Sequence, residues 1–187
     1  MLRAEYKLNI FFLWKTFMSD NATNRMAILP NLITTANAVC GFVALTLIAG
    51  AQFNGGALEN PQDLKIAAWL IFIGMIFDVL DGRIARMTGG TSNFGAQLDS
   101  LADLVTFGLA PAGLIIALNR TAWPEPWQKV AWVMGLAYFL GAILRLARFN
   151  AEHDEAEDAH LCFKGIPTPA AAGTIAGLVL VHSWLSQ

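Results

Sequence analysis

Apolar residues fall into five long runs, separated by shorter segments that are polar or contain glycine and proline. The runs cover residues 28–51, 64–87, 97–118, 129–149 and 166–185. A helix needs roughly 20 mainly apolar residues to cross the hydrocarbon core of a bilayer. The pattern therefore predicts an all-α integral membrane protein with five transmembrane helices.

Composition supports a membrane protein. Of the 187 residues, 56% are apolar and only 14% are charged, and the mean hydropathy is +0.50. Soluble domains usually have roughly 25% charged residues. The formal net charge is −2 and no basic stripe or nucleic-acid motif is present, so we expect no nucleic-acid partner. Cys40 and Cys162 lie far apart and suggest neither a disulfide framework nor a metal site.

The N-terminal segment differs from the five runs. Its apolar centre, residues 10–14, is too short to span a bilayer and is flanked by basic residues. A helix lying in the membrane interface fits this pattern. We therefore expect a juxtamembrane segment over residues 1–25 and a transmembrane domain over residues 26–187.

Four aspartates stand at the junction of the second and third runs. Asp78 and Asp81 end one run, and Asp99 and Asp103 begin the next. Residues three or four apart share a helix face, so an antiparallel hairpin would bring the four carboxylates together. Carboxylates this close repel one another in a low dielectric, which calls for divalent cations. Oxygen ligands suit Mg²⁺, Mn²⁺ or Ca²⁺ rather than zinc.

Small residues and an arginine accompany the acids. Gly82 and Ala85 lie on the stripe of Asp78 and Asp81, and they leave room for a ligand to approach the backbone. Arg86 follows and could hold a phosphate by a bidentate contact. The combination fits a metal-bound diphosphate. Helix capping alone is a weaker explanation, because acids inside a membrane are costly and usually functional.

The stretch from residue 78 to residue 103 reads Asp-x2-Asp-Gly-x2-Ala-Arg-x8-Gly-x3-Asp-x3-Asp. It resembles the signature of the CDP-alcohol phosphatidyltransferases, membrane enzymes of phospholipid synthesis. The resemblance implies two divalent cations, Mg²⁺ or Mn²⁺ with Ca²⁺ able to occupy the site, which hold the diphosphate of a CDP-linked lipid. It implies that Asp78, Asp81 and Asp99 are metal ligands and that Asp103 is the general base and a further ligand. It also implies a core of six spans and a homodimer.

Polar residues in the first run suggest a second part of this site. Thr34, Asn37 and Gly41 share one helix face. Such residues either form hydrogen bonds between helices or line the nucleotide site. The pattern Pro-Asn-x2-Thr-x2-Asn-x3-Gly, residues 30–41, resembles the first helix of phosphatidylserine synthases within the family and favours the second reading. The residues expected to bind the CDP-lipid are Thr34, Asn37, Gly82, Ala85, Arg86 and Gly95.

The end of the fourth run carries a basic pair. Arg145 and Arg148 share a helix face and precede Asn150. They either anchor the helix at the membrane surface or recognise an anion, such as an amino-acid carboxylate or a phosphate. The sequences Arg-x2-Arg-Phe-Asn and Gly-Ile-Pro-x-Pro resemble motifs of phosphatidylserine synthases. The resemblance implies serine as the acceptor, bound by Arg145, Arg148, Asn150 and Lys164.

The resulting hypothesis is transfer of a phosphatidyl group from CDP-diacylglycerol to L-serine, with release of CMP. Asp103 would accept the hydroxyl proton. Glycerol 3-phosphate, inositol or inositol phosphate as acceptor is the alternative within the family. A divalent-cation transporter is the alternative of another class, although it gives Gly82, Ala85 and Arg86 no role.

Basic residues predict the orientation. Nine of the 12 Lys and Arg residues lie in the N-terminal segment, the 83–96 region and the 145–165 region. The positive-inside rule places these regions at the cytoplasm. We therefore expect a protein of the inner (cytoplasmic) membrane whose active site faces the cytoplasm.

Overall fold

The computed structural model describes residues 29–50, 61–87, 93–122, 124, 127–155 and 166–185. Within these ranges every regular element is a helix, which confirms the predicted all-α class. The expected interfacial helix over residues 1–25 lies outside the described ranges. The helices are Leu29–Gly50, α2 (Pro61–Met87), α3 (Asn93–Asp103), the π-helical turn η1 (Leu104–Leu109), α4 (Ala110–Ala122), α5 (Trp127–Glu155) and α6 (Thr168–Leu185).

Each predicted apolar run corresponds to a long helix, and α3, η1 and α4 together form the third. In the part of the chain that the structure describes, four helices are long and apolar enough to cross a membrane: Leu29–Gly50, Phe94–Asn119, Trp127–Ala151 and Thr168–Leu185. The second predicted span, α2, has 27 residues but is not among these four. It carries six charged residues, two near its start and four toward its end: Asp63, Lys65, Asp78, Asp81, Arg83 and Arg86.

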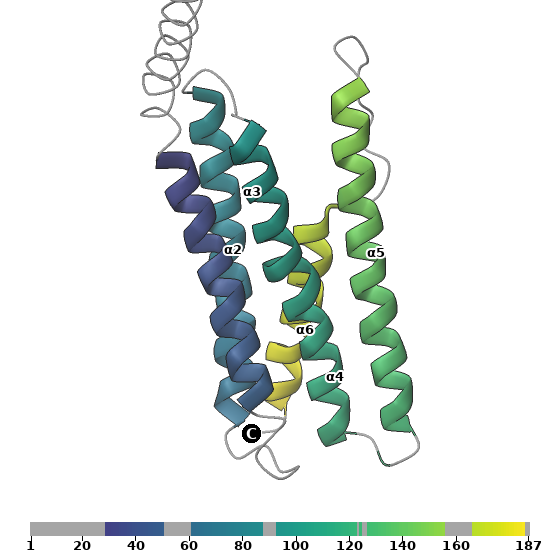
Figure 1. Ribbon diagram of the computed structural model, residues 1–187. Helices are drawn as coiled ribbons and strands as arrows, with labels where there is room; N and C mark the ends of the chain where they lie inside the picture. Colours follow the sequence, from purple (N-terminus) through teal and green to yellow (C-terminus); the bar gives the residue numbers. More distant parts are fainter. Residues whose placement is uncertain are drawn as a thin grey trace, which may run out of the picture.

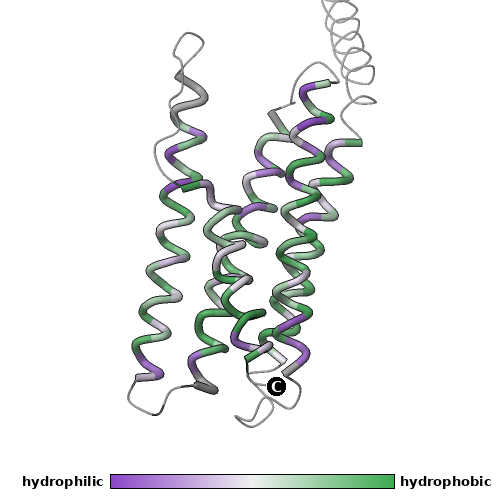
Figure 2. Tube along the Cα trace, turned by 180° about the vertical axis from the view of Figure 1, so that it is seen from behind, coloured by the Kyte–Doolittle hydropathy of each residue, from purple (hydrophilic) through white to green (hydrophobic). Residues whose placement is uncertain are grey.

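The helices run side by side as an elongated bundle (Figure 1). The Leu29–Gly50 helix lies beside α2, α2 packs along α6, and α4 packs along α5. α5 stands at the edge of the bundle. Figure 2 shows that hydrophobic positions fill the middle of the bundle, while many hydrophilic positions gather toward its ends. This distribution is the one expected for a protein that lies across a bilayer.

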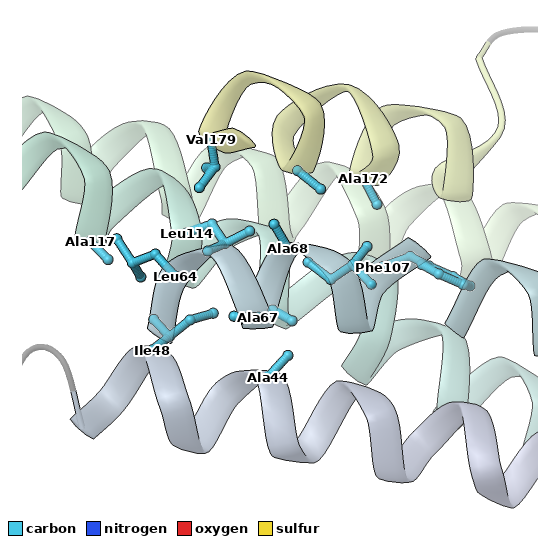
Figure 3. Packing of buried hydrophobic residues seen from close by; sticks show 13 residues of the cluster. Ala44, Ile48, Leu64, Ala67, Ala68, Phe107, Leu114, Ala117, Ala172 and Val179 are labelled. Atoms are coloured by element: carbon cyan, nitrogen blue, oxygen red, sulfur yellow. The ribbon is translucent and has the colours of Figure 1, made fainter. Parts of the chain in front are cut away.

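The centre of the bundle consists of small and aliphatic side chains (Figure 3). Alanines from four helices, Leu29–Gly50, α2, α4 and α6, are buried there, which lets the helix backbones approach closely. Leucine, isoleucine, valine and phenylalanine side chains fill the remaining space between them. The buried cluster comprises Ala44, Ile48, Leu64, Ala67, Ala68, Ile71, Phe107, Ala110, Leu114, Ala117, Ala172, Ala176 and Val179.

The third helix widens directly after Asp103. In the turn η1, the backbone N–H of Ala110 donates to the oxygen of Val105, five residues earlier. Two side-chain hydrogen bonds join this turn to other helices. Thr106 Oγ1, in η1, donates to the backbone oxygen of Asn37 at 2.9 Å, and the Tyr138 hydroxyl, in α5, donates to the backbone oxygen of Phe107 at 2.9 Å. Single π-helical turns are rare and are often found at functional sites. This one joins the acid-bearing α3 to the apolar α4.

Candidate functional site

Three aspartates from two helices meet in one small volume. Asp78 lies toward the C-terminal end of α2, and Asp99 and Asp103 lie in the second half of α3. Each contributes one carboxylate oxygen, and these three oxygens lie within 4.8 Å of one another. The three side chains are half-buried. The arrangement of α2 and α3 thus brings Asp78 close to Asp99 and Asp103, which follow it by 21 and 25 residues in the sequence.

The donor set suits a hard divalent cation. Oδ1 of Asp99 is buried and has no hydrogen-bond partner among the described residues. A buried acceptor without a donor is unfavourable, and three ionised carboxylates this close repel one another. A divalent cation would satisfy the orphaned oxygen and offset the repulsion. Oxygen-only ligation is the chemistry of Mg²⁺, Mn²⁺ and Ca²⁺.

Asp81 lies beside this group of three and not in it. Its side chain is 4% exposed, and Oδ2 accepts a hydrogen bond from Thr34 Oγ1 at 2.7 Å. Three residues after Asp78, a helix has turned about 300°, so the two side chains point about 60° apart. We expected all four acids to act as metal ligands. For Asp81 this role therefore remains a prediction.

Asn37 is fully buried, with 0% of its side chain exposed. Its Nδ2 donates to Oδ1 of Asp103 at 3.2 Å, and its backbone oxygen accepts from Thr106. Thr34, at 4% exposure, is nearly as buried. The two residues expected to line the nucleotide site thus lie against carboxylates of the acidic motif.

The remaining residues expected to bind the CDP-lipid differ in their surroundings. A Cβ atom added at Gly82 would meet no atom within 4 Å, so the backbone there borders open space. Its place on the stripe had suggested that Ala85 also borders this opening. Ala85 is only 5% exposed, so it does not widen the opening. Arg86 is exposed, and its Nε donates to the backbone oxygen of Gly82 at 3.0 Å. Gly95 is half-buried in the first turn of α3.

The residues expected to bind serine lie toward the C-terminal end of α5. Arg145 is half-buried, and Arg148 and Asn150 are exposed. Asn150 Nδ2 donates to Ser100 Oγ at 3.0 Å, and Ser100 follows Asp99 in α3. This contact joins the end of α5 to the helix that carries two of the clustered acids. Lys164 lies outside the described residues.

Three contributors to the site were not predicted from the sequence. Thr106 holds the backbone of Asn37, Ser100 bonds to Asn150, and a Cβ at Gly74 would lie 2.9 Å from Asn37 Oδ1. The spacing contained a signal for two of them. Gly74 is four residues before Asp78, and Thr106 is three residues after Asp103, so each shares a helix face with an acid.

Curated proteins with similar sequences carry related names. The chain is 38% identical over 157 residues to a CDP-diacylglycerol–serine O-phosphatidyltransferase of Mycobacterium bovis, covering 82% of this chain and 49% of the relative. It is 32% identical over 160 residues to the enzyme of that name in Helicobacter pylori, covering 86% and 60%. It is 31% identical over 165 residues to the archaetidylserine synthase of Methanothermobacter thermautotrophicus, covering 87% and 62%.

The chain thus spans about half to three fifths of the length of these curated relatives. No solved structure matches it significantly. The family model for CDP-alcohol phosphatidyltransferase matches residues 27–187, a range that includes the helix bearing Thr34 and Asn37 and all four aspartates. Motif, carboxylate cluster and family match agree, and the chain belongs to the CDP-alcohol phosphatidyltransferase family.

Proposed function

We propose that the protein transfers the phosphatidyl group of CDP-diacylglycerol to L-serine, forming phosphatidylserine and releasing CMP. The observation that carries the proposal is the meeting of Asp78, Asp99 and Asp103, three of the four acids of the family motif, whose carboxylate oxygens lie within 4.8 Å of one another. Serine as the acceptor is supported by the names of the relatives, which include serine both in the phosphatidyl and in the archaetidyl enzymes.

Asp78, Asp81, Asp99 and Asp103 would hold two divalent cations, Mg²⁺ or Mn²⁺. When bound, these ions neutralise the diphosphate and stabilise the charge that develops on the attacked phosphorus and on the leaving CMP. The orphaned Oδ1 of Asp99 supports a ligand role for that residue, because the described residues give this oxygen no donor.

Asp103 accepts the proton of the serine hydroxyl. The serine oxygen then forms a bond to the phosphorus on the lipid side, and the bond from that phosphorus to the CMP oxygen breaks, with CMP taking the electron pair. Asn37 occupies one lone pair of Asp103 Oδ1, which leaves acceptor capacity on the carboxylate for the incoming proton.

Gly82 and Arg86 bind the CDP end of the lipid. The open space at Gly82 admits the nucleotide close to α2, and the exposed Arg86 contacts a phosphate. Arg145, Arg148, Asn150 and Lys164 would bind the serine carboxylate. The contact of Asn150 with Ser100 supports this assignment, since it links α5 to the acid-bearing helix.

The positive-inside rule favours a cytoplasmic active site in the inner membrane. The reaction's water-soluble participants, serine and CMP, then exchange with the cytoplasm. The acyl chains of the donor remain in the bilayer. The homodimer that the motif resemblance implies stays a prediction.

The test is CMP release by the full chain, purified in detergent, with CDP-diacylglycerol and either Mn²⁺ or Mg²⁺. L-serine, glycerol 3-phosphate, inositol and inositol phosphate are supplied separately. We expect release that depends on serine and is abolished by EDTA. Release with another acceptor only would overturn the assignment of Arg145 and Arg148. If a folded, metal-binding protein releases no CMP with any acceptor, the transferase proposal fails. A metal-flux assay in liposomes would then test the transporter alternative.

A further inference from the structure

The Leu29–Gly50 helix contacts one carboxylate from each of the two acid-bearing helices. Thr34 Oγ1 donates to Asp81 Oδ2 on α2 at 2.7 Å. One turn later, Asn37 Nδ2 donates to Asp103 Oδ1 on α3 at 3.2 Å. Both donors are on one face of the helix, three residues apart. A single helix thus fixes a carboxylate in each half of the acidic motif.

We infer that Thr34 and Asn37 are positioning residues, which hold the carboxylates of Asp81 and Asp103 in place and do not contact the nucleotide. Burial supports this assignment, because Asn37 at 0% exposure has no surface to offer a substrate. The inference deepens the proposed function and rests on it for the role of the two acids. It replaces the expectation that these residues form a wall of the nucleotide site.

Asn37 is held at its backbone and confined at its side chain. Its backbone oxygen accepts the hydrogen bond of Thr106, and its Oδ1 lies where Gly74 has no side chain, without a hydrogen-bond partner among the described residues. The amide orientation follows from its partner, since an ionised carboxylate only accepts hydrogen bonds and must face the NH₂ group. Asn37 therefore presents a fixed donor to Asp103.

Thr34 differs from its neighbour Thr35 in its burial and in its contact with a carboxylate. Each hydroxyl lies near the backbone oxygen four residues earlier, Thr34 at 3.1 Å from Pro30 and Thr35 at 2.7 Å from Asn31. Only Thr34 is buried and also reaches a carboxylate. The pair therefore separates the effect of bonding Asp81 from the general effect of a threonine in this helix.

Residues that orient metal ligands typically change metal affinity or activity by roughly 10- to 100-fold when they are replaced. A residue that contacts the nucleotide would instead raise the KM for the CDP-lipid. Direct binding of Mn²⁺ to the full chain in detergent, followed by the EPR signal of the free ion, distinguishes the two roles. This measurement needs neither CDP-lipid nor serine, so a failure of the proposed acceptor would not affect it.

The variants are Asn37→Leu and Thr34→Val, which keep the side-chain shape and remove the donor. We expect each to weaken Mn²⁺ binding by at least about tenfold, with the KM for CDP-diacylglycerol at saturating Mn²⁺ within about twofold of the parent protein. Thr34→Ser restores the hydroxyl and should recover the loss, and Thr35→Val should bind Mn²⁺ like the parent protein.

Unchanged Mn²⁺ binding together with a raised KM for the CDP-lipid would overturn the inference and return Thr34 and Asn37 to the nucleotide site. An equal loss in Thr35→Val would also overturn it, because the effect would then belong to the helix as a whole. If Asn37→Leu fails to fold in detergent, the comparison of Thr34→Val with Thr34→Ser decides the question.

Discussion

A Cβ atom placed on Gly74 would lie 2.6 Å from Cγ2 of Thr106. Thr106 leaves equally little room on the Leu29–Gly50 helix, where a Cβ at Gly41 would lie 2.8 Å from the Cα of Thr106. Real Cβ contacts are never that short. Thr106 therefore fits between α2 and the Leu29–Gly50 helix because both helices have glycine at the point of contact. In this position its hydroxyl bonds to the backbone of Asn37, next to Asp103.

Gly74→Ala should destabilise the protein and lower its activity. The new methyl group would overlap Thr106 and would approach Asn37 Oδ1 to 2.9 Å, so the helices must separate. Overpacking of this kind costs about 1–3 kcal/mol. We expect a lower midpoint of thermal unfolding in detergent and weaker Mn²⁺ binding. Gly177→Ala is the matched control, since a Cβ there would meet no atom within 4 Å. An unchanged midpoint and unchanged Mn²⁺ binding for Gly74→Ala would contradict the close packing.

Tyr138→Phe should weaken the π-helical turn. The Tyr138 hydroxyl donates to the backbone oxygen of Phe107 inside η1, and the phenylalanine ring would keep the packing while removing the donor. A neutral hydrogen bond contributes about 1 kcal/mol, so we expect a small decrease in the thermal midpoint. We also expect slower CMP release, because the turn begins directly after Asp103. A variant with the midpoint and the rate of the parent protein would show that the turn forms without this bond.

Helical periodicity explains why so much of the fold could be predicted. Runs of about 20 apolar residues determine where helices form, and the spacing of Asp99 and Asp103 determines that they share a face. The sequence also indicated a turn between the second and third runs. A hairpin at this turn would bring Asp78 near Asp99 and Asp103. These are local properties of the chain, and they do not depend on which helices become neighbours.

The contacts between helices could not be obtained in this way. Periodicity placed Thr34 and Asn37 on one helix face but did not show what this face contacts. From periodicity alone, the two side chains could line a nucleotide site or form hydrogen bonds to another helix. The π-helical turn after Asp103 changes the helical register, and no residue pattern in the sequence predicted this turn. Ala85 shares a stripe with Gly82, yet it is buried while Gly82 borders open space, because neighbouring helices cover only part of the stripe.

Removal of divalent cations should abolish activity reversibly. Treatment with EDTA is expected to stop CMP release, and added Mn²⁺ or Mg²⁺ should restore it. Asp78→Asn removes one of the three clustered carboxylates and should weaken Mn²⁺ binding by at least about tenfold. Asp63→Asn, in the first turn of the same helix, is the control and should bind Mn²⁺ like the parent protein. Equal affinity of the Asp78 variant and the parent protein would exclude Asp78 as a ligand.

Arg145→Gln should raise the KM for L-serine. If the guanidinium binds the serine carboxylate, its loss removes a charge-assisted hydrogen bond, which is worth about 1.5–3 kcal/mol, or roughly 10- to 100-fold in KM. The KM for CDP-diacylglycerol should stay within about twofold. Lys129→Gln removes a basic residue from the other end of α5 and should change neither constant. A selective rise in the KM for the CDP-lipid would instead assign Arg145 to a phosphate.

Gly82→Ala separates the stability of the protein from the binding of its substrate. A Cβ at this position would meet no protein atom within 4 Å, and alanine is the better helix former by about 1 kcal/mol. The variant should therefore unfold at the midpoint of the parent protein or above it. If the nucleotide lies against α2 at this point, the new methyl group occupies its space, and the KM for CDP-diacylglycerol should rise about tenfold while Mn²⁺ binding is unchanged. Gly177→Ala, which also adds a methyl group in open space, should leave the KM unaltered. A Gly82→Ala variant with the KM of the parent protein would show that the open space at Gly82 is not where the nucleotide binds.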